Sequence, residues 1–287
     1  MVNFLKYKWL YFTISAIVIL VGLFSIFRWG FIYSIDFVGG TNIEYKTGKA
    51  VSSGMVRNIL IKKGVSAITL RISPGGIFIR AAPTDEKKEK KLREALEKDL
   101  DTKVEVLRFE TVGPIIGKET VRKTIIATLL GVSAILIYMS FAFRGFNFAV
   151  SAILALVHDL MVLVGMYALL SHFFGAQVDT LFVTAVLTTM SFSVHDTIVI
   201  FDKIREHMKE EGRRNVEHIA NKALTETMVR SLNNSMTIVF VLLALTLLGG
   251  STIRFFIIAL LVGTITGTYS SPFIATPILV WMEGKKE

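Results

Sequence analysis

One carboxylate stands in an otherwise apolar stretch of this chain. Between Thr180 and Phe201, Asp196 has a single titratable companion, its neighbour His195. A charged side chain at the centre of a membrane-spanning helix costs about 2.5–3.5 kcal/mol, so such residues are rare and tend to serve a function. Coupling to an ion gradient needs a buried carboxylate that can change its proton or its partner. Ion coupling is therefore the chemistry that we expect of Asp196.

The residues around Asp196 predict a polar face on one helix. Helical periodicity places four side chains on that face: Thr189, Ser193, Asp196 and Lys203. Because lipid offers no partner for polar groups, this face must point at protein or water. Thr197 adds to the polar surroundings. We expect His195, on an adjoining stripe, to support Asp196 rather than to carry the proton itself.

A second polar group opens the next predicted helix. Arg230, Asn233 and Asn234 enter it from the side on which the helix of Asp196 ends. At 1.5 Å per residue, Asp196 lies about 10 Å from that end. An approach of Asp196 to Arg230, direct or through the two asparagines and water, is one expectation. The alternative is that the long Arg230 side chain simply extends to the membrane interface.

His158 and Asp159 fall near the middle of another apolar segment, 147–171. Polar side chains often join helices by hydrogen bonds, and this structural role is the favoured interpretation for Asp159. His-Asp pairs also occur in metal-dependent hydrolases. Here no further His or carboxylate ligands accompany the pair, so we expect neither a metal site nor catalysis.

Two glycine motifs have structural interpretations. Gly263 and Gly267, extended to Ser271, form a small-xxx-small pattern, which is typical of closely packed membrane helices. Gly39 and Gly40 are not followed by the Gly-Lys frame of a phosphate-binding loop. We therefore expect no nucleotide and no other cofactor.

The composition indicates an integral membrane protein. Of 287 residues, 52% are hydrophobic and 19% are charged, and the chain contains no cysteine. In ordinary soluble domains about a quarter of the residues are charged. The net charge of +9 agrees with the excess of Lys and Arg that is expected in the cytoplasmic loops of membrane proteins. It is only a weak sign of nucleic-acid binding. The lack of cysteine excludes disulfides, thiol catalysis and thiolate metal sites.

Six segments are long enough to cross a bilayer, which needs about 20 apolar residues. They are 9–28, 122–143, 147–171, 180–202, 231–249 and 253–281, the last with a kinked end at Pro272 and Pro277. Positive charges gather on one side of this topology: Lys6, Lys8, Arg144, the loop 203–230, Lys285 and Lys286. By the positive-inside rule, both termini are predicted to be cytoplasmic in a multi-pass protein of the cell membrane. The chain thus divides into 1–29 with the first helix, 30–120 outside, and 121–287 with helices two to six.

The polar stretch between the first two helices predicts a small α+β domain. Strand-like alternation and helical segments follow the order 41–46, 52–63, 67–72, 77–81, 85–100 and 104–109. A Pro-Gly turn at Pro74 joins the two middle strands. The order β-α-β-β-α-β is that of the ferredoxin-like fold. We therefore expect a six-helix membrane protein with one extracytoplasmic ferredoxin-like domain.

Several motifs together resemble the SecD/SecF protein-export membrane proteins of the resistance-nodulation-division superfamily. The run Asp36-Phe37-Val38-Gly39-Gly40-Thr41 is similar to the D-F-x-G-G-T signature of that family. The stretch 193–206 is similar to its S-x-N-D-[ST] block ending in F-D-[RK]-I-R-E, and 155–159 and 263–271 resemble further blocks. Six helices and one outside domain match the SecF arrangement, in an archaeal-like form.

The resemblance implies a function without enzymatic activity. It implies a complex with SecD, association with the Sec translocon, contact with the translocating preprotein, and the use of a proton or sodium gradient instead of ATP. By motif, Asp196 corresponds to the coupling carboxylate and Arg230 to its basic neighbour. The alternative is a stand-alone transporter of small molecules or lipids.

This sequence departs from the family pattern at two places. His195 stands where bacterial members usually have Asn, and Asn233-Asn234-Ser235 replaces a segment rich in Thr and Ser. The first departure adds a titratable group, and the second exchanges hydroxyls for amides. Both leave open which ion is coupled.

Overall fold

The computed structural model describes residues 2–49, 51–73, 75–143, 145–212 and 215–284. Within it the chain forms two compact units, a helical unit of Met1–Ile32 with Ile126–Glu287 and a sheet unit of Tyr33–Ile125. Four residues used in the predictions lie outside the described residues: Pro74, Arg144, Lys285 and Lys286.

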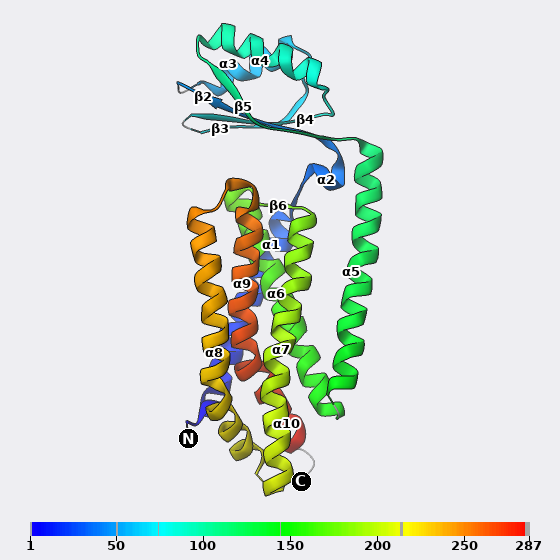
Figure 1. Ribbon diagram of the computed structural model, residues 1–287, viewed down its shortest axis with the longest axis vertical. Helices are drawn as coiled ribbons and strands as arrows, with labels where there is room; N and C mark the ends of the chain where they lie inside the picture. Colours follow the sequence, from blue (N-terminus) through cyan, green and yellow to red (C-terminus); the bar gives the residue numbers. More distant parts are fainter. Residues whose placement is uncertain (1, 50, 74, 144, 213–214, 285–287) are drawn as a thin grey trace. The chain divides into compact units, whose positions relative to one another are not determined.

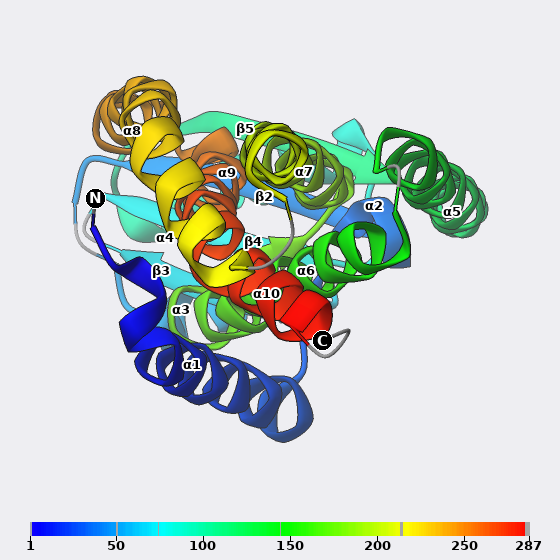
Figure 2. The same cartoon turned by 90° about the horizontal axis from the view of Figure 1, so that it is seen from below.

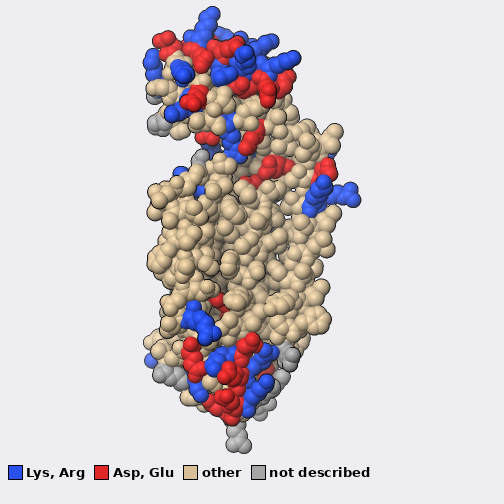
Figure 3. Space-filling model, in the orientation of Figure 1, with Lys and Arg blue, Asp and Glu red and all other residues tan. Residues whose placement is uncertain are grey.

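Six helical stretches among the described residues are long and apolar enough to cross a membrane, as predicted (Figure 1). They are α1 (Lys8–Trp29), preceded by η1 (Phe4–Tyr7); α5 (Pro114–Ala142); α6 (Phe146–Phe174); α7 (Thr180–Glu211); α8 (Val216–Leu248); and α9 (Arg254–Ser270) continued by η3 (Ser271–Ala275) and α10 (Thr276–Glu283). The short elements β1 (Ile32–Tyr33), β6 (Gln177–Val178) and η2 (Ser251–Ile253) lie between them. Figure 3 shows Lys, Arg, Asp and Glu gathered at one end of the helical unit, next to a broad band of other residues.

The prediction of a loop over residues 203–230 is wrong, because most of these residues are helical. α7 continues to Glu211 and ends at Gly212, whose φ of +79° suits glycine. α8 begins after Asn215, whose side chain accepts a hydrogen bond from the backbone of His218 (3.0 Å). The end of an apolar segment marks where a helix leaves the membrane and not where the helix ends. Arg230 therefore lies inside α8 and not at its start.

The predicted kink near Pro272 takes the form of a π-helical segment, η3, between α9 and α10. Proline cannot donate a backbone hydrogen bond, and its ring displaces the preceding turn. A π-helical turn absorbs this displacement without breaking the helix. The Thr276 hydroxyl donates to the carbonyl of Ser271 at 3.0 Å, which helps to satisfy the backbone there.

Glycines allow two pairs of helices to pack with their backbones close together (Figure 2). A Cβ atom on Gly22 of α1 would lie 2.8 Å from the Cα of Gly165 on α6. On α9, a Cβ on Gly263 would overlap the side chain of Thr189, and one on Gly267 would lie 3.1 Å from the Cα of Ser193. Small residues at such contacts are the means by which membrane helices approach closely. They hold α9 against the polar face of α7.

The sheet unit contains the predicted β-α-β-β-α-β order. Its elements are β2 (Gly40–Thr47), α3 (Ser53–Lys62), β3 (Ala67–Ser73), β4 (Gly76–Ala81), α4 (Glu86–Leu100) and β5 (Val104–Val112), after a short α2 (Ile35–Val38). The four strands are antiparallel in the order β3-β4-β2-β5, and α3 and α4 cover one face (Figure 1).

The core of the sheet unit lies between that face and the two helices. Ile43, Ile79 and Leu92 are fully buried there. Tyr45 donates a hydrogen bond to Glu89 at 3.1 Å, and burial together with this carboxylate raises the pKa of Tyr45. Alternating apolar residues on β2 and β4 thus specify which face is covered.

Candidate functional site

Two carboxylates are buried in the helical unit away from its charged end, and the first is Asp159 on α6. Its Oδ2 atom accepts hydrogen bonds from Ser193 of α7 (2.5 Å) and from Ser270 of α9 (2.7 Å). Its Oδ1 atom lies 2.9 Å from Nδ1 of His158. We call these four residues the Asp159 cluster. The cluster joins three helices through one side chain.

The second carboxylate is Asp196 on α7, which is 8% exposed. Its Oδ2 atom accepts a hydrogen bond from Ser231 of α8 at 2.8 Å. A cavity of about 10 Å³ adjoins it, with Ser235 and Thr268 in its lining. That volume is close to what one water molecule needs. We call Asp196, Ser231, Ser235 and Thr268 the Asp196 cluster.

Two further hydroxyl groups, on α7 and η3, lie next to the clusters. Thr197 donates to the carbonyl of Ser193 at 3.0 Å, and its hydroxyl lies 2.8 Å from that of Ser271. Within the Asp196 cluster, Thr268 of α9 donates to Ser235 at 2.7 Å. Ser193 belongs to the Asp159 cluster and precedes Asp196 by less than one helical turn. A shift of α7 at one carboxylate therefore reaches the other.

The structure separates the predicted pair of Asp196 and Arg230. Arg230 is exposed on α8 and lines a surface groove with Lys203 and Glu226, and within the described residues no Lys or Arg side chain lies within 4 Å of the Asp196 carboxylate. Ser231, the next residue along α8, occupies the position that we expected of Arg230. Neighbouring residues on a helix point about 100° apart. The face of α8 toward Asp196 thus carries hydroxyls.

The other predicted partners of Asp196 also lie on outer faces. His195, Asn233 and Asn234 are exposed, although His195 and Asn234 border the small cavity. In contrast, Thr189, Ser193 and Thr197 are buried, as a polar face toward protein requires. The predicted stripe extends to Lys203, which contacts Glu206 at 2.9 Å and Glu226 at 3.4 Å near the helix end.

Sequence reasoning missed the hydroxyl donors. Ser231 and Ser235 on α8 and Ser270 on α9 hold the two carboxylate clusters together. A signal for the first pair existed, because Ser231 and Ser235 are four residues apart and share a helix face. Serine is common in membrane helices, so only its position opposite a carboxylate reveals the role.

The two glycines of the D-F-x-G-G-T signature, Gly39 and Gly40, lie where the chain enters the sheet unit. Gly39 and Gly40 have φ values of +74° and +129°, which only glycine adopts readily. A Cβ on Gly40 would lie 2.9 Å from the carbonyl oxygen of Ala81. Thr41 accepts a hydrogen bond from the backbone of Thr84 at 2.8 Å. The run that begins with Asp36 thus directs the chain into the first strand of the sheet.

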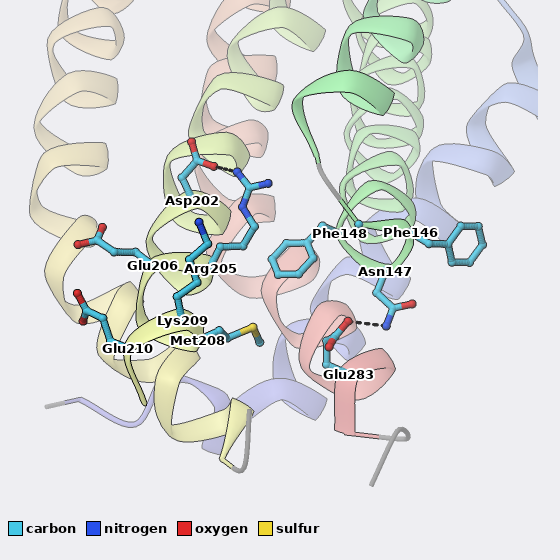
Figure 4. Close-up of a pocket in the computed structure, with 11 residues that line it drawn as sticks. Phe146, Asn147, Phe148, Asp202, Arg205, Glu206, Met208, Lys209, Glu210 and Glu283 are labelled. Atoms are coloured by element: carbon cyan, nitrogen blue, oxygen red, sulfur yellow. Dashed lines mark hydrogen bonds and ion pairs between the residues drawn. The ribbon is translucent and has the colours of Figure 1, made fainter. Parts of the chain in front are cut away.

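A larger hollow of about 650 Å³ lies at the charged end of the helical unit (Figure 4). Arg205 pairs with Asp202 and lies over the ring of Phe148 at 6.0 Å. Asn147 donates to Glu283 at 2.6 Å. These groups satisfy one another, which is typical of a solvated helix end and not of an ion-coupling site.

Two buried carboxylates that accept hydrogen bonds from hydroxyls can carry out only a few kinds of chemistry. A carboxylate in a low-dielectric interior can bind a proton or a small cation. Ser193, Ser270 and Ser231 each donate to such a carboxylate and not to a histidine nitrogen that could take the proton of a nucleophile. The described residues contain no group of three or more His, Cys, Asp or Glu that could hold a metal ion. The arrangement is suited to binding and releasing an ion.

Comparison with known proteins relates these residues to a family. The family model of the protein export membrane protein SecD/SecF, C-terminal, matches residues 92–285, and that of the SecD/SecF GG motif matches residues 24–51. The chain belongs to the SecF family of protein translocase subunits. SecF of Thermobaculum terrenum is 38% identical over 99% of this chain and 95% of its own length. SecF of Anaerolinea thermophila is 36% identical over 99% and 96%.

A solved SecDF structure from Thermus thermophilus, described as a translocon-associated membrane protein, has the same fold. It superposes on 99% of this chain with a TM-score of 0.86 at 31% identity, and this chain covers 39% of it. The curated SecDF of Thermus thermophilus is 34% identical over 91% of this chain and 36% of its own length. The predicted six-helix fold and the non-enzymatic family are confirmed. The archaeal-like form stays a prediction.

Proposed function

We propose that this SecF-family chain works with a SecD partner to promote translocation of preproteins through the Sec channel, using an ion gradient rather than ATP. The proton is the favoured ion. The observation that carries the proposal is the burial of Asp196 beside the hydroxyl of Ser231, with no Lys or Arg among the described residues within 4 Å. A buried carboxylate without a cationic partner is strongly disfavoured unless it takes up a cation.

The partner is inferred from relatives in which both parts form one chain. This chain covers 36% of the curated SecDF and 39% of the solved one, so a larger part of each relative lies outside it. We infer that a separate SecD supplies that part here. In this arrangement both termini are cytoplasmic, the sheet unit is extracytoplasmic, and the translocon and the emerging preprotein are the further partners.

Arg230 enters the proposal as a partner that Asp196 gains when α8 turns. Ser231 faces Asp196 in this structure, and Arg230 lies about 100° away around the same helix. A rotation of α8 by that angle exchanges a hydroxyl for a guanidinium. The guanidinium stabilises the ionised carboxylate and so favours release of the proton. His195 and Asn234, at the border of the cavity, line the route of the ion.

The test is export into inverted membrane vesicles with and without a proton gradient. Asp196→Asn keeps the shape and the hydrogen bond from Ser231 but removes the ionisable group. We expect gradient-dependent stimulation of export to be lost in Asp196→Asn and in Arg230→Met. Asp202→Asn is the matched control, because Asp202 lies on the same helix but is exposed and paired with Arg205.

Two outcomes would contradict the proposal. If the proton gradient stimulates export equally in Asp196→Asn and in the unaltered protein, at equal abundance of both in the membrane, this carboxylate has no coupling role. Full stimulation in vesicles that lack SecD would remove the requirement for that partner.

A further inference from the structure

We propose that His158 and Asp159 form a second proton-binding site in the helical unit, which binds one proton in addition to the ion bound at Asp196. The inference starts from the two ring nitrogens of His158. Nδ1 lies 2.9 Å from Asp159 Oδ1, whereas Nε2 is buried and has no hydrogen-bond partner among the described residues.

The carboxylate determines which nitrogen carries the hydrogen in the neutral ring. An ionised carboxylate only accepts hydrogen bonds, so Nδ1 must donate to Asp159. Nε2 then presents a bare lone pair in a buried position. This lone pair is where the ring can bind a proton, and the resulting imidazolium carries its positive charge against the Asp159 carboxylate.

The charge of the pair leads to the same conclusion. Neutral His158 beside ionised Asp159 leaves one uncompensated negative charge, and the two side chains are only 8% and 7% exposed. Binding one proton makes the pair electrically neutral as a whole, either as imidazolium with carboxylate or as imidazole with carboxylic acid. Because the two groups share the proton, it belongs to the pair and not to either residue.

No other charged group among the described residues compensates Asp159 at contact distance. On α7 the titratable side chains next to Ser193 are His195, which is exposed, and Asp196, which carries the same sign of charge as Asp159. From α9, the ring of Tyr269 lies 6.4 Å from the ring of His158, and its hydroxyl donates to the backbone of Tyr11 on α1 (3.0 Å). The pair therefore depends on a proton for neutrality.

Protonation of this site acts on the helices that carry the other carboxylate. While Asp159 is ionised, its Oδ2 atom accepts from both Ser193 and Ser270. If the proton moves onto that oxygen, the oxygen becomes a donor, and one of the two hydroxyls has to change from donating to accepting. The hydrogen bonding of α6 with α7 or with α9 then rearranges. Ser193 transmits this change along α7 to Asp196.

The inference rests on the proposed function for its role in export, but proton binding itself is measured separately. Proton uptake by the purified full-length chain in lipid vesicles is counted by titration across the range of about pH 4 to 9, in which His and carboxyl groups change charge. Acid-minus-neutral infrared difference spectra of the same samples identify carboxyl and imidazole bands. The variants are Asp159→Asn, His158→Gln and the double variant.

Asparagine at 159 keeps the local shape, since its amide oxygen accepts from Ser193 and Ser270. We expect Asp159→Asn to take up one proton fewer than the unaltered chain, because His158 then has no carboxylate to neutralise. In His158→Gln the buried carboxylate should take up the proton itself, so the count stays the same and the proton appears as a carboxyl band. The double variant should lose no more than Asp159→Asn, because both remove the same proton. His218→Gln, at the start of α8, is the control, and its loss should add to that of Asp159→Asn.

The proposal is overturned if Asp159→Asn takes up as many protons as the unaltered chain, or if the double variant loses one proton more than Asp159→Asn does. If Asp159→Asn does not fold, His158→Gln decides the matter, since the Asp159 carboxyl band must then change in the difference spectrum. Asp196→Asn separates the two proposals. Export that persists in Asp196→Asn counts against the coupling role of Asp196, whereas the proton count of the His158–Asp159 pair tests this site alone.

Discussion

Asp159 and Asp196 are the same residue type, on neighbouring helices of one unit, and yet their surroundings differ. Asp159 accepts from Ser193 and Ser270, contacts His158, and joins α6, α7 and α9. Asp196 accepts from Ser231 and borders a cavity of about 10 Å³. A carboxylate surrounded by donors holds helices together, whereas one beside a water-sized space can exchange its partner. We therefore expect Asp159 to contribute more than Asp196 to the stability of the helical unit. We expect Asp196 to contribute more than Asp159 to ion coupling.

The largest expected effect tests that assignment directly. Asp159→Leu leaves Ser193, Ser270 and His158 buried without their common acceptor. Each buried polar group that loses its partner costs about 1–3 kcal/mol, so we expect a loss of about 3–5 kcal/mol of unfolding free energy. Asp196→Leu leaves Ser231 without its acceptor, and we expect a loss of about 1–3 kcal/mol. Thermal unfolding of the purified proteins in detergent measures both changes. Equal losses in the two variants would contradict the comparison.

A glycine between the clusters gives the second test. Gly267→Ala places a Cβ 3.1 Å from the Cα of Ser193, so α9 must move away from α7. Overpacking of this kind costs about 1–3 kcal/mol. The movement also lengthens the contacts of Ser270 with Asp159 and of Thr268 with Ser235, so export stimulation should fall as well. The control is Gly54→Ala in α3, where the nearest atom lies 3.9 Å away. An unaltered melting temperature in Gly267→Ala would show that α9 is not held at this distance.

The smallest expected effects come from single hydroxyls. Ser270→Ala removes one donor from Asp159 and Ser231→Ala removes one from Asp196, each at a cost of about 0.5–1.5 kcal/mol, because a single hydrogen bond is lost. We expect Ser231→Ala to reduce gradient-dependent export more than Ser270→Ala does at similar stability. Vesicle export assays with both variants, at matched protein abundance, check this order. The reverse order would move the coupling role toward Asp159.

Particular residues show how far the sequence could lead. Apolar length predicted the six helical stretches, and alternation predicted the β-α-β-β-α-β order of the sheet unit, because both patterns are local. The burial of Thr189, Ser193 and Asp196 also followed from helical periodicity. In this structure Ser231 contacts Asp196 in place of Arg230, because hydropathy placed the start of α8 too late and left its rotation unspecified. The approach of Asp196 to Arg230 stays a prediction.

The sequence by itself determined that certain helix faces are polar and buried. With 3.6 residues per turn, polar residues three and four positions apart lie on one face of an apolar helix, and in a membrane that face must point at protein or water. Which hydroxyl meets which carboxylate was decided only by tertiary structure. Close packing at Gly22, Gly165, Gly263 and Gly267 sets the distances and rotations of the helices. A rotation by one residue, about 100°, exchanges Ser231 for Arg230. Packing therefore determines what Asp196 touches, although the sequence determines that it is there.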